Sequence, residues 1–155
     1  MDAVTYPRAE SERALSEDFV ALRAQIDKNE ALAKRFRAAW TPGIVFLDHE
    51  DTIHYRAFGY HPPVEFEHLL RVGRGMIEFQ RGQYARAVEA FQHAADDPRH
   101  SALRPEAIYW QGVSRYKSGD KDALAGTWTR LIDLYPESIW AQRASVIRPR
   151  AGIAA

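Results

Sequence analysis

The residues that could hold a metal ion gather in one short stretch of the chain. His49, Glu50, Asp51 and His54 lie close together, and imidazole and carboxylate groups are common ligands of zinc. Their spacing differs from the i, i+4 histidine pair of a zinc protease helix. Polar residues are also typical of a tight turn. We therefore interpret this stretch as a hairpin tip and predict no metal site.

Other chemistry is limited by the residue types that are present. The chain has no cysteine, which excludes disulfides, thiolate metal sites and thiol nucleophiles. Ser101, Ser114 and Ser118 have no plausible arrangement of histidine and aspartate in the sequence that would predict a catalytic triad. Gly73 and Gly75 fall inside an expected helix and not in a phosphate-binding loop. We predict no catalytic residue and no cofactor, and we lean towards a protein that is not an enzyme.

Composition and charge restrict the partners. The chain has 155 residues, enough for one domain or two small units that share a core. Its 21 basic and 21 acidic residues cancel, so neither nucleic acid nor an anionic membrane is an expected partner. It has no apolar run of about 18 residues and no signal-peptide pattern at its start. We expect a cytoplasmic location.

The first half of the chain reads as a mixture of helices and strands. A polar helix is expected over 8–18, and a strand over 19–27 with Val20, Leu22 and Ile26 as core contacts. A second helix follows over 30–39 and ends before Thr41-Pro42. The apolar run 43–48 and the stretch 52–60 then predict a β-hairpin.

The second half reads as helical and contains an internal repeat. Gly75 and Gly112 are 37 residues apart, as are Phe91 and Trp128. Helices are expected over 64–81, 84–96, 103–118, 121–134 and 138–147, with turns near Gly82 and Gly119. A fixed period of this length is typical of stacked helical hairpins, each of which buries a face that its neighbour leaves open.

These helical segments resemble the tetratricopeptide repeat. In the first copy the matching residues are Gly75, Phe79, Gly82, Tyr84, Ala87, Phe91 and Ala94. In the second copy they are Ala107, Gly112, Tyr116, Gly119, Asp120, Trp128 and Pro136. The second copy departs from the pattern at Gln111, Arg115 and Leu124. The stretch that begins at Tyr135-Pro136 is similar to the end of a repeat followed by a capping helix.

This resemblance implies a groove that binds an extended peptide or a helix. The groove-lining positions would be Met76, Phe79, Gln80, Tyr109, Val113, Tyr116 and Lys117. Aromatic contact combined with polar anchoring is a common mode of peptide recognition. The other aromatic residues of this half are interpreted mainly as core or as packing between helices.

The first half resembles the rear portion of a thioredoxin-like domain, over about residues 1–72. The resemblance depends on Asp27, Asn29-Glu30, Thr41-Pro42, Phe46-Leu47-Asp48, Arg56 and Gly59. It implies a cis peptide bond between Thr41 and Pro42, the position that lies beside the dithiol in redox-active relatives. The strand and the Cys-x-x-Cys helix of that family would precede the present sequence. Without a thiolate, this chain should be redox-inert.

We therefore expect an α+β, mostly helical protein. A partial thioredoxin-like sheet of about three strands (1–72) would precede two tetratricopeptide-like hairpins with a capping helix (64–150), the first helix being shared. The favoured function is non-catalytic binding of a protein or peptide. The alternative is the C-terminal part of a thiol–disulfide oxidoreductase whose Cys-x-x-Cys lies upstream. A third possibility is a structural subunit that self-associates, because the incomplete sheet would rearrange or complete itself in a homodimer.

Overall fold

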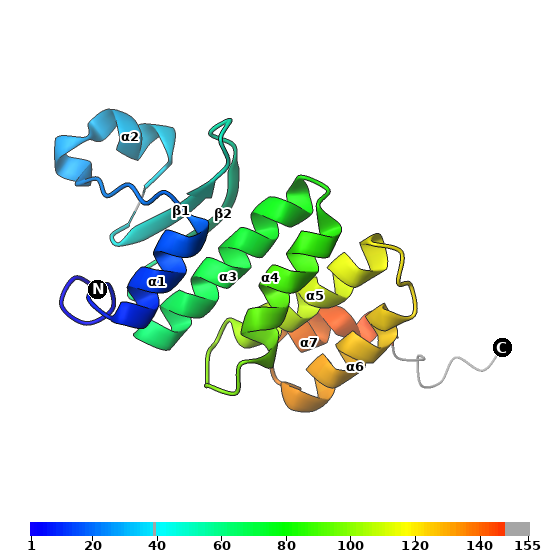
Figure 1. Cartoon of the computed structure of the whole chain (residues 1–155). Helices are drawn as coiled ribbons and strands as arrows, with labels where there is room; N and C mark the ends of the chain where they lie inside the picture. The colour runs from blue at the N-terminus through cyan, green and yellow to red at the C-terminus, as the bar shows by residue number, and fades with distance from the viewer. Residues whose placement is uncertain (39, 148–155) are drawn as a thin grey trace.

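Helices dominate the computed structural model, which describes residues 1–38 and 40–147 (Figure 1). The first half contains α1 (Ala9–Asp18), the short 3-10 helix η1 (Ile26–Lys28), α2 (Glu30–Arg35), β1 (Gly43–Leu47) and β2 (Ile53–Phe58). The second half contains α3 (Pro63–Gln80), α4 (Tyr84–Asp96), α5 (Arg104–Lys117), α6 (Ala123–Leu134), α7 (Ile139–Ala144) and the 3-10 helix η2 (Ser145–Ile147). The predicted order of helices after Pro63 is confirmed. The last residues of the predicted repeat unit, 148–150, lie outside the described residues.

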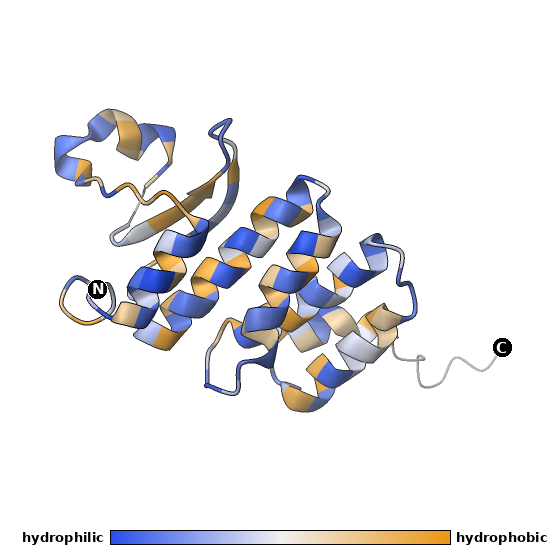
Figure 2. Ribbon diagram, in the orientation of Figure 1, coloured by the Kyte–Doolittle hydropathy of each residue, from blue (hydrophilic) through white to orange (hydrophobic). Residues whose placement is uncertain are grey.

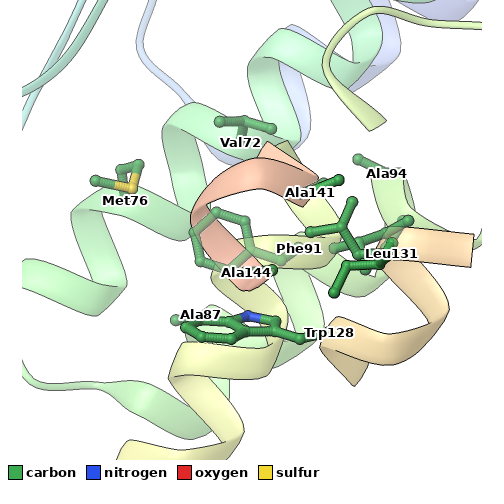
Figure 3. Packing of buried hydrophobic residues seen from close by; sticks show 13 residues of the cluster. Val72, Met76, Ala87, Phe91, Ala94, Trp128, Leu131, Ala141 and Ala144 are labelled. Carbon is green, nitrogen blue, oxygen red and sulfur yellow. The ribbon is translucent and has the colours of Figure 1, made fainter. Parts of the chain in front are cut away.

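The two helical hairpins, α3–α4 and α5–α6, are built by the same contact. A methyl group at Gly75 would lie 2.5 Å from the Phe91 ring, and one at Gly112 would lie 3.0 Å from the Trp128 ring. Glycine therefore lets an aromatic ring of the second helix reach the backbone of the first. Figure 3 shows Phe91 and Trp128 in one cluster with small alanines from α4 and α7. The 37-residue interval of the sequence is thus an interval between equivalent packing sites.

The turns of both hairpins are made possible by glycine. Gly82 (φ +76°) and Gly119 (φ +109°) adopt the left-handed conformation that side chains other than glycine rarely tolerate. In Figure 2 the turns that join α3 to α4 and α5 to α6 are coloured mainly as hydrophilic. Each turn therefore reverses the chain at the surface while the helices bury their apolar sides.

The β-hairpin packs on α3. Strands β1 and β2 pair antiparallel, with Gly43 opposite Phe58 and Phe46 opposite Tyr55. Phe46 is buried and occupies the space beside Gly73 of α3, where any side chain would overlap its ring. Figure 1 shows α1 lying alongside α3, and the Arg71 guanidinium donates to the Asp18 carboxylate at 2.6 Å between these helices. The first helix of the repeat half thus packs against the two-stranded sheet.

The prediction of a strand over 19–27 is wrong. Residues 19–25 form neither helix nor strand, and Ile26–Lys28 form η1. Val20 is 101% and Leu22 83% exposed, so they are not core contacts. Figure 2 shows this segment as largely hydrophobic. A strand needs a hydrogen-bonded neighbour, and in the described residues the sheet has two strands, β1 paired with β2.

Two smaller predictions have opposite outcomes. The Thr41–Pro42 peptide bond is cis, as predicted. The helix expected over 30–39 is shorter, since α2 ends at Arg35. Its last predicted residue, Ala39, lies outside the described residues. None of the helices within 1–38 and 40–147 combines the length and apolarity needed to cross a membrane.

Candidate functional site

Three partly exposed aromatic rings form a continuous strip across the first helix of each helical unit. Phe79 comes from α3, Trp110 from α5 and Trp140 from α7. The ring centroids of Phe79 and Trp110 are 5.2 Å apart, and those of Trp110 and Trp140 are 6.4 Å apart. We call these three residues the aromatic strip. Because the helices stack side by side, side chains far apart in sequence meet on one surface.

The rings of the strip contact further aromatic side chains. The Tyr109 ring stacks on the buried Trp128 ring at 4.7 Å, with an interplanar angle of 15°. The Trp128 indole N–H donates to the Tyr109 carbonyl oxygen at 3.1 Å. The ring centroid of Tyr109 also lies 5.1 Å from that of Trp140, and the ring centroid of Tyr84 lies 5.5 Å from that of Phe79. Aromatic side chains held in this way lose little conformational entropy when they bind a partner.

A cation is held at the α7 end of the strip. Ser138 caps the start of α7, where its hydroxyl oxygen accepts a hydrogen bond from the Ala141 N–H at 3.0 Å. One turn later, the Arg143 guanidinium lies 4.5 Å from the centre of the Trp140 ring. A guanidinium over an indole face is attracted by the electron density of the ring. Arg143 is exposed, and none of the described residues forms an ion pair with it.

A buried carboxyl group joins the β-hairpin to this helical layer. The Tyr55 hydroxyl of β2 donates to Oε2 of Glu106, in the first turn of α5, at 2.9 Å. Burial raises the pKa of Glu106, while the Tyr55 hydrogen bond and the charge of Arg143 act in the opposite direction. The same burial raises the pKa of Tyr55. The electrostatic effect of Arg143 on Glu106 shows that α7 brings its charge towards the start of α5.

The predicted groove residues fall in different environments. Phe79 belongs to the strip, Tyr109 contacts two of its rings, and Val113 is half-buried against the same cluster. Met76 is buried in the core. Gln80 is exposed, but its amide is hydrogen-bonded to His54. Tyr116 (41% exposed) and Lys117 are open to solvent at the end of α5.

Thr41 and Pro42 do not belong to the strip. They precede β1, where the Pro42 carbonyl oxygen accepts a hydrogen bond from the Gly59 N–H at 2.8 Å. Thr41 is exposed and Pro42 is half-buried.

Trp110 and Trp140 pack against the core cluster, as the sequence interpretation expected, but that interpretation did not indicate that both stay partly exposed or that Arg143 lies over Trp140. The tryptophans read as core because such side chains usually are. One signal was present, since Trp140 and Arg143 are three residues apart on a helix, the spacing at which side chains meet. That signal does not say which side of α7 faces solvent.

The histidine-rich stretch forms a structural turn. His54 is buried, and its Nε2 lies 2.9 Å from the Asp48 carboxylate. His49 and Glu50 are exposed, and Asp51 pairs with Arg35 at 2.5 Å. Within the part of the chain that the structure describes, no three histidine or acidic side chains are grouped so that they could hold a metal ion.

A polar hollow of about 240 Å³ lies between α1, α3 and the segment that follows α4. Its charges largely satisfy one another, since Arg71 pairs with Asp18 and Arg99 pairs with Glu67. Both ring nitrogens of His68, which lines it, are shielded from solvent. Nε2 of His68 lies 3.0 Å from Oδ2 of Asp97, so the hollow is lined by polar and charged side chains that contact one another.

Comparison with known proteins identifies part of the helical half. A model of the tetratricopeptide repeat matches residues 106–138. This stretch runs from the first turn of α5, through α6, to the Ser138 cap of α7. No curated protein and no solved structure matches the chain. The predicted tetratricopeptide-like repeat is thus supported, whereas these comparisons provide no support for the thioredoxin-like resemblance.

Proposed function

We propose that this chain is a protein–protein interaction module and that the aromatic strip, with Tyr116 and Lys117 beside it, is its binding surface. Repeats of the tetratricopeptide kind suggest protein partners, and the matched repeat contributes Trp110 to the strip. The observation that carries the proposal is the placement of Phe79, Trp110 and Trp140 as neighbouring, partly exposed rings.

The proposal has a physical reason in the balance between the apolar area that binding buries and the side-chain entropy that it removes. Large rings that are already fixed by packing bury much apolar area at little entropic cost. Tryptophan and tyrosine are accordingly enriched among the residues that dominate binding energies at interfaces. A short extended peptide or one helix would match the size of a strip made from three helices.

The test is a selection of displayed random peptides on the purified chain, followed by affinity measurements on variants. Trp140→Ala should weaken the binding of the selected peptides by roughly tenfold or more, because removing an aromatic anchor typically costs more than about 1 kcal/mol. Tyr135→Ala is the matched control, since Tyr135 is a half-buried aromatic on the same core that lies outside the strip. Circular dichroism would confirm that both variants remain folded. Peptides that bind Trp140→Ala as tightly as the parent protein would refute the proposal.

A second candidate function is the rear part of a thiol–disulfide oxidoreductase whose Cys-x-x-Cys lies upstream. Val20 and Leu22 are exposed apolar residues, and their exposure does not distinguish this candidate from a binding module. The chain itself has no cysteine and cannot exchange disulfides. The intact mass of the protein purified from its source cells tests this alternative. A mass above 17.7 kDa with two reactive thiols would support it, and a mass of 17.7 kDa would exclude it.

A further inference from the structure

Arg143 has the geometry of a group that receives an anion. Its guanidinium lies over Trp140, so one face of the planar cation is covered by the ring. The N–H groups at the edge of a stacked guanidinium remain free to donate, and their fork matches the two oxygens of a carboxylate. Among residues 1–38 and 40–147 no acidic side chain forms an ion pair with it. Arg143 therefore offers donors next to an apolar surface. Its charge acts on the buried Glu106, but it forms no ion pair with that carboxyl or with another acidic side chain of the described residues.

Helices α5 and α7, which carry Trp110 and Trp140, are more basic than the rest of the chain. Helices α5 and α7 together contain four basic residues and one acidic residue, whereas the whole chain is neutral. The acidic residue, Glu106, is buried and bound to Tyr55. Of the basic residues, Arg115 is paired with Asp120. Lys117 is exposed and, like Arg143, has no ion pair in the described part of the chain.

We propose that the partner of the aromatic strip is an acidic polypeptide segment. An apolar or aromatic side chain of that segment packs on Trp110 and Trp140, and a neighbouring carboxylate accepts hydrogen bonds from Arg143. Lys117 attracts further acidic residues along α5. This inference rests on the proposed function and adds the charge of the partner to it.

The physical basis is charge complementarity beside a surface that excludes water. An ion pair on an open surface contributes little, because water screens it. When a ring packs on Trp140, it removes water from one side of the guanidinium, so that the attraction to a carboxylate is stronger. The apolar contact and the ion pair therefore reinforce each other, and a segment with only one of the two features should bind less well.

The experiment uses three fluorescein-labelled synthetic peptides that share the same tryptophan and leucine positions. Their remaining positions are glutamate in one peptide, glutamine in the second and lysine in the third. Fluorescence anisotropy at low salt measures binding to the full chain. The glutamate peptide should bind roughly tenfold more tightly than the glutamine peptide, as expected for one charge-assisted pair, and the lysine peptide should bind least. Added salt should reduce the difference between the peptides.

Variants then connect the charge preference to Arg143. Arg143→Gln should remove most of the preference for glutamate over glutamine. Arg143→Lys should restore only part of it, because an ammonium cannot form the two parallel hydrogen bonds. Arg86→Gln is the matched control, since Arg86 is an exposed arginine on α4, outside α5 and α7. It should leave the preference unchanged.

The possible results separate the inference from the proposed function. If all three peptides bind alike, or if Arg143→Gln keeps the preference, the inference is wrong while the binding function stands. If no peptide of any charge binds, and none is enriched by display, both are wrong. Tighter binding of a short single-stranded oligothymidine than of the glutamate peptide would also overturn the inference, because the cations would then serve nucleic acid.

Discussion

His54 is held between two hydrogen-bond acceptors. Its Nε2 lies 2.9 Å from Asp48 Oδ2, and its Nδ1 lies 3.0 Å from Gln80 Oε1. The Gln80 amide N–H donates to the His54 carbonyl oxygen at 3.2 Å, which orients the amide oxygen towards the ring. Each ring nitrogen of His54 therefore lies within hydrogen-bond distance of a side-chain oxygen. One side chain thus ties the turn between β1 and β2 to the end of α3.

This arrangement predicts an acid-dependent loss of stability. The hydrogen bond from His54, with help from the N–H groups of Thr52 and Glu50, lowers the pKa of Asp48 from its ordinary 3.8 to about 2. A lowered folded-state pKa contributes stability that is present above 3.8 and is lost as the pH falls towards 2. Asp48→Asn should be less stable than the parent at neutral pH and should lose less stability on acidification.

Urea denaturation at a series of pH values measures this effect. Glu50→Gln is the control, because Glu50 lies in the same turn with a 74% exposed side chain. It should follow the parent curve. If the free energy of unfolding of Asp48→Asn and of the parent changed equally with pH, the stabilising role of the Asp48 carboxylate would be contradicted.

The helices pack closely at some glycine positions and not at others. At Gly75 an added methyl group would lie 2.5 Å from the Phe91 ring, and at Gly112 it would lie 3.0 Å from Trp128. At Gly126, in α6, it would meet nothing within 4 Å. Alanine favours a helix over glycine by about 1 kcal/mol, whereas overpacking a core costs roughly 1–3 kcal/mol.

The three alanine substitutions should therefore differ in sign. Gly126→Ala should raise the free energy of unfolding by up to about 1 kcal/mol, from helix propensity alone. Gly75→Ala should lower it by roughly 1–3 kcal/mol, because Phe91 is fully buried and has no room to withdraw. The change in the free energy of unfolding caused by Gly112→Ala should lie between those of the other two variants. Thermal unfolding of the three variants provides the measurement, and a stabilised Gly75→Ala would show that the contact is not tight.

The molecule is held together by two buried clusters that meet at Tyr55 and Leu103. One cluster fills the helical layers around Phe91, and the other lies between α1, α3 and the hairpin around Leu69. Tyr55 contacts both clusters, and its hydroxyl donates to Glu106 of α5. The β-hairpin and the second helical hairpin are therefore coupled through the Tyr55–Glu106 hydrogen bond, which lies in apolar surroundings.

Breaking that contact should destabilise the whole chain. Tyr55→Phe leaves the buried Glu106 carboxyl without its donor and should cost about 1–3 kcal/mol. Glu106→Gln keeps an acceptor for Tyr55. It should gain stability relative to the parent as the pH rises above 4.5, because a raised carboxyl pKa means that the parent loses stability in that range. Equal pH dependence of Glu106→Gln and the parent in urea denaturation would disprove this role.

The helical half was predictable from the sequence because helices satisfy most of their hydrogen bonds locally. The apolar periodicity, Gly82, Gly119 and the repeated glycine–aromatic spacing indicate the helices and their turns within a few residues of the observed bounds. The β1–β2 hairpin was predictable for a related reason. Its two strands are neighbours in sequence and pair with each other.

Two features depend on contacts between distant parts of the chain, which local patterns do not contain. Residues 19–27 have a strand-like composition, but with no neighbouring strand to pair with, residues 20–25 remain an exposed coil and Ile26–Lys28 form η1. The aromatic strip is the opposite case. The way α3, α5 and α7 stack decides which sides of Phe79, Trp110 and Trp140 remain open to solvent and where Arg143 meets Trp140. Residue types and periods are local properties of the chain, whereas exposure and charge next to an apolar surface arise only when separate helices pack together.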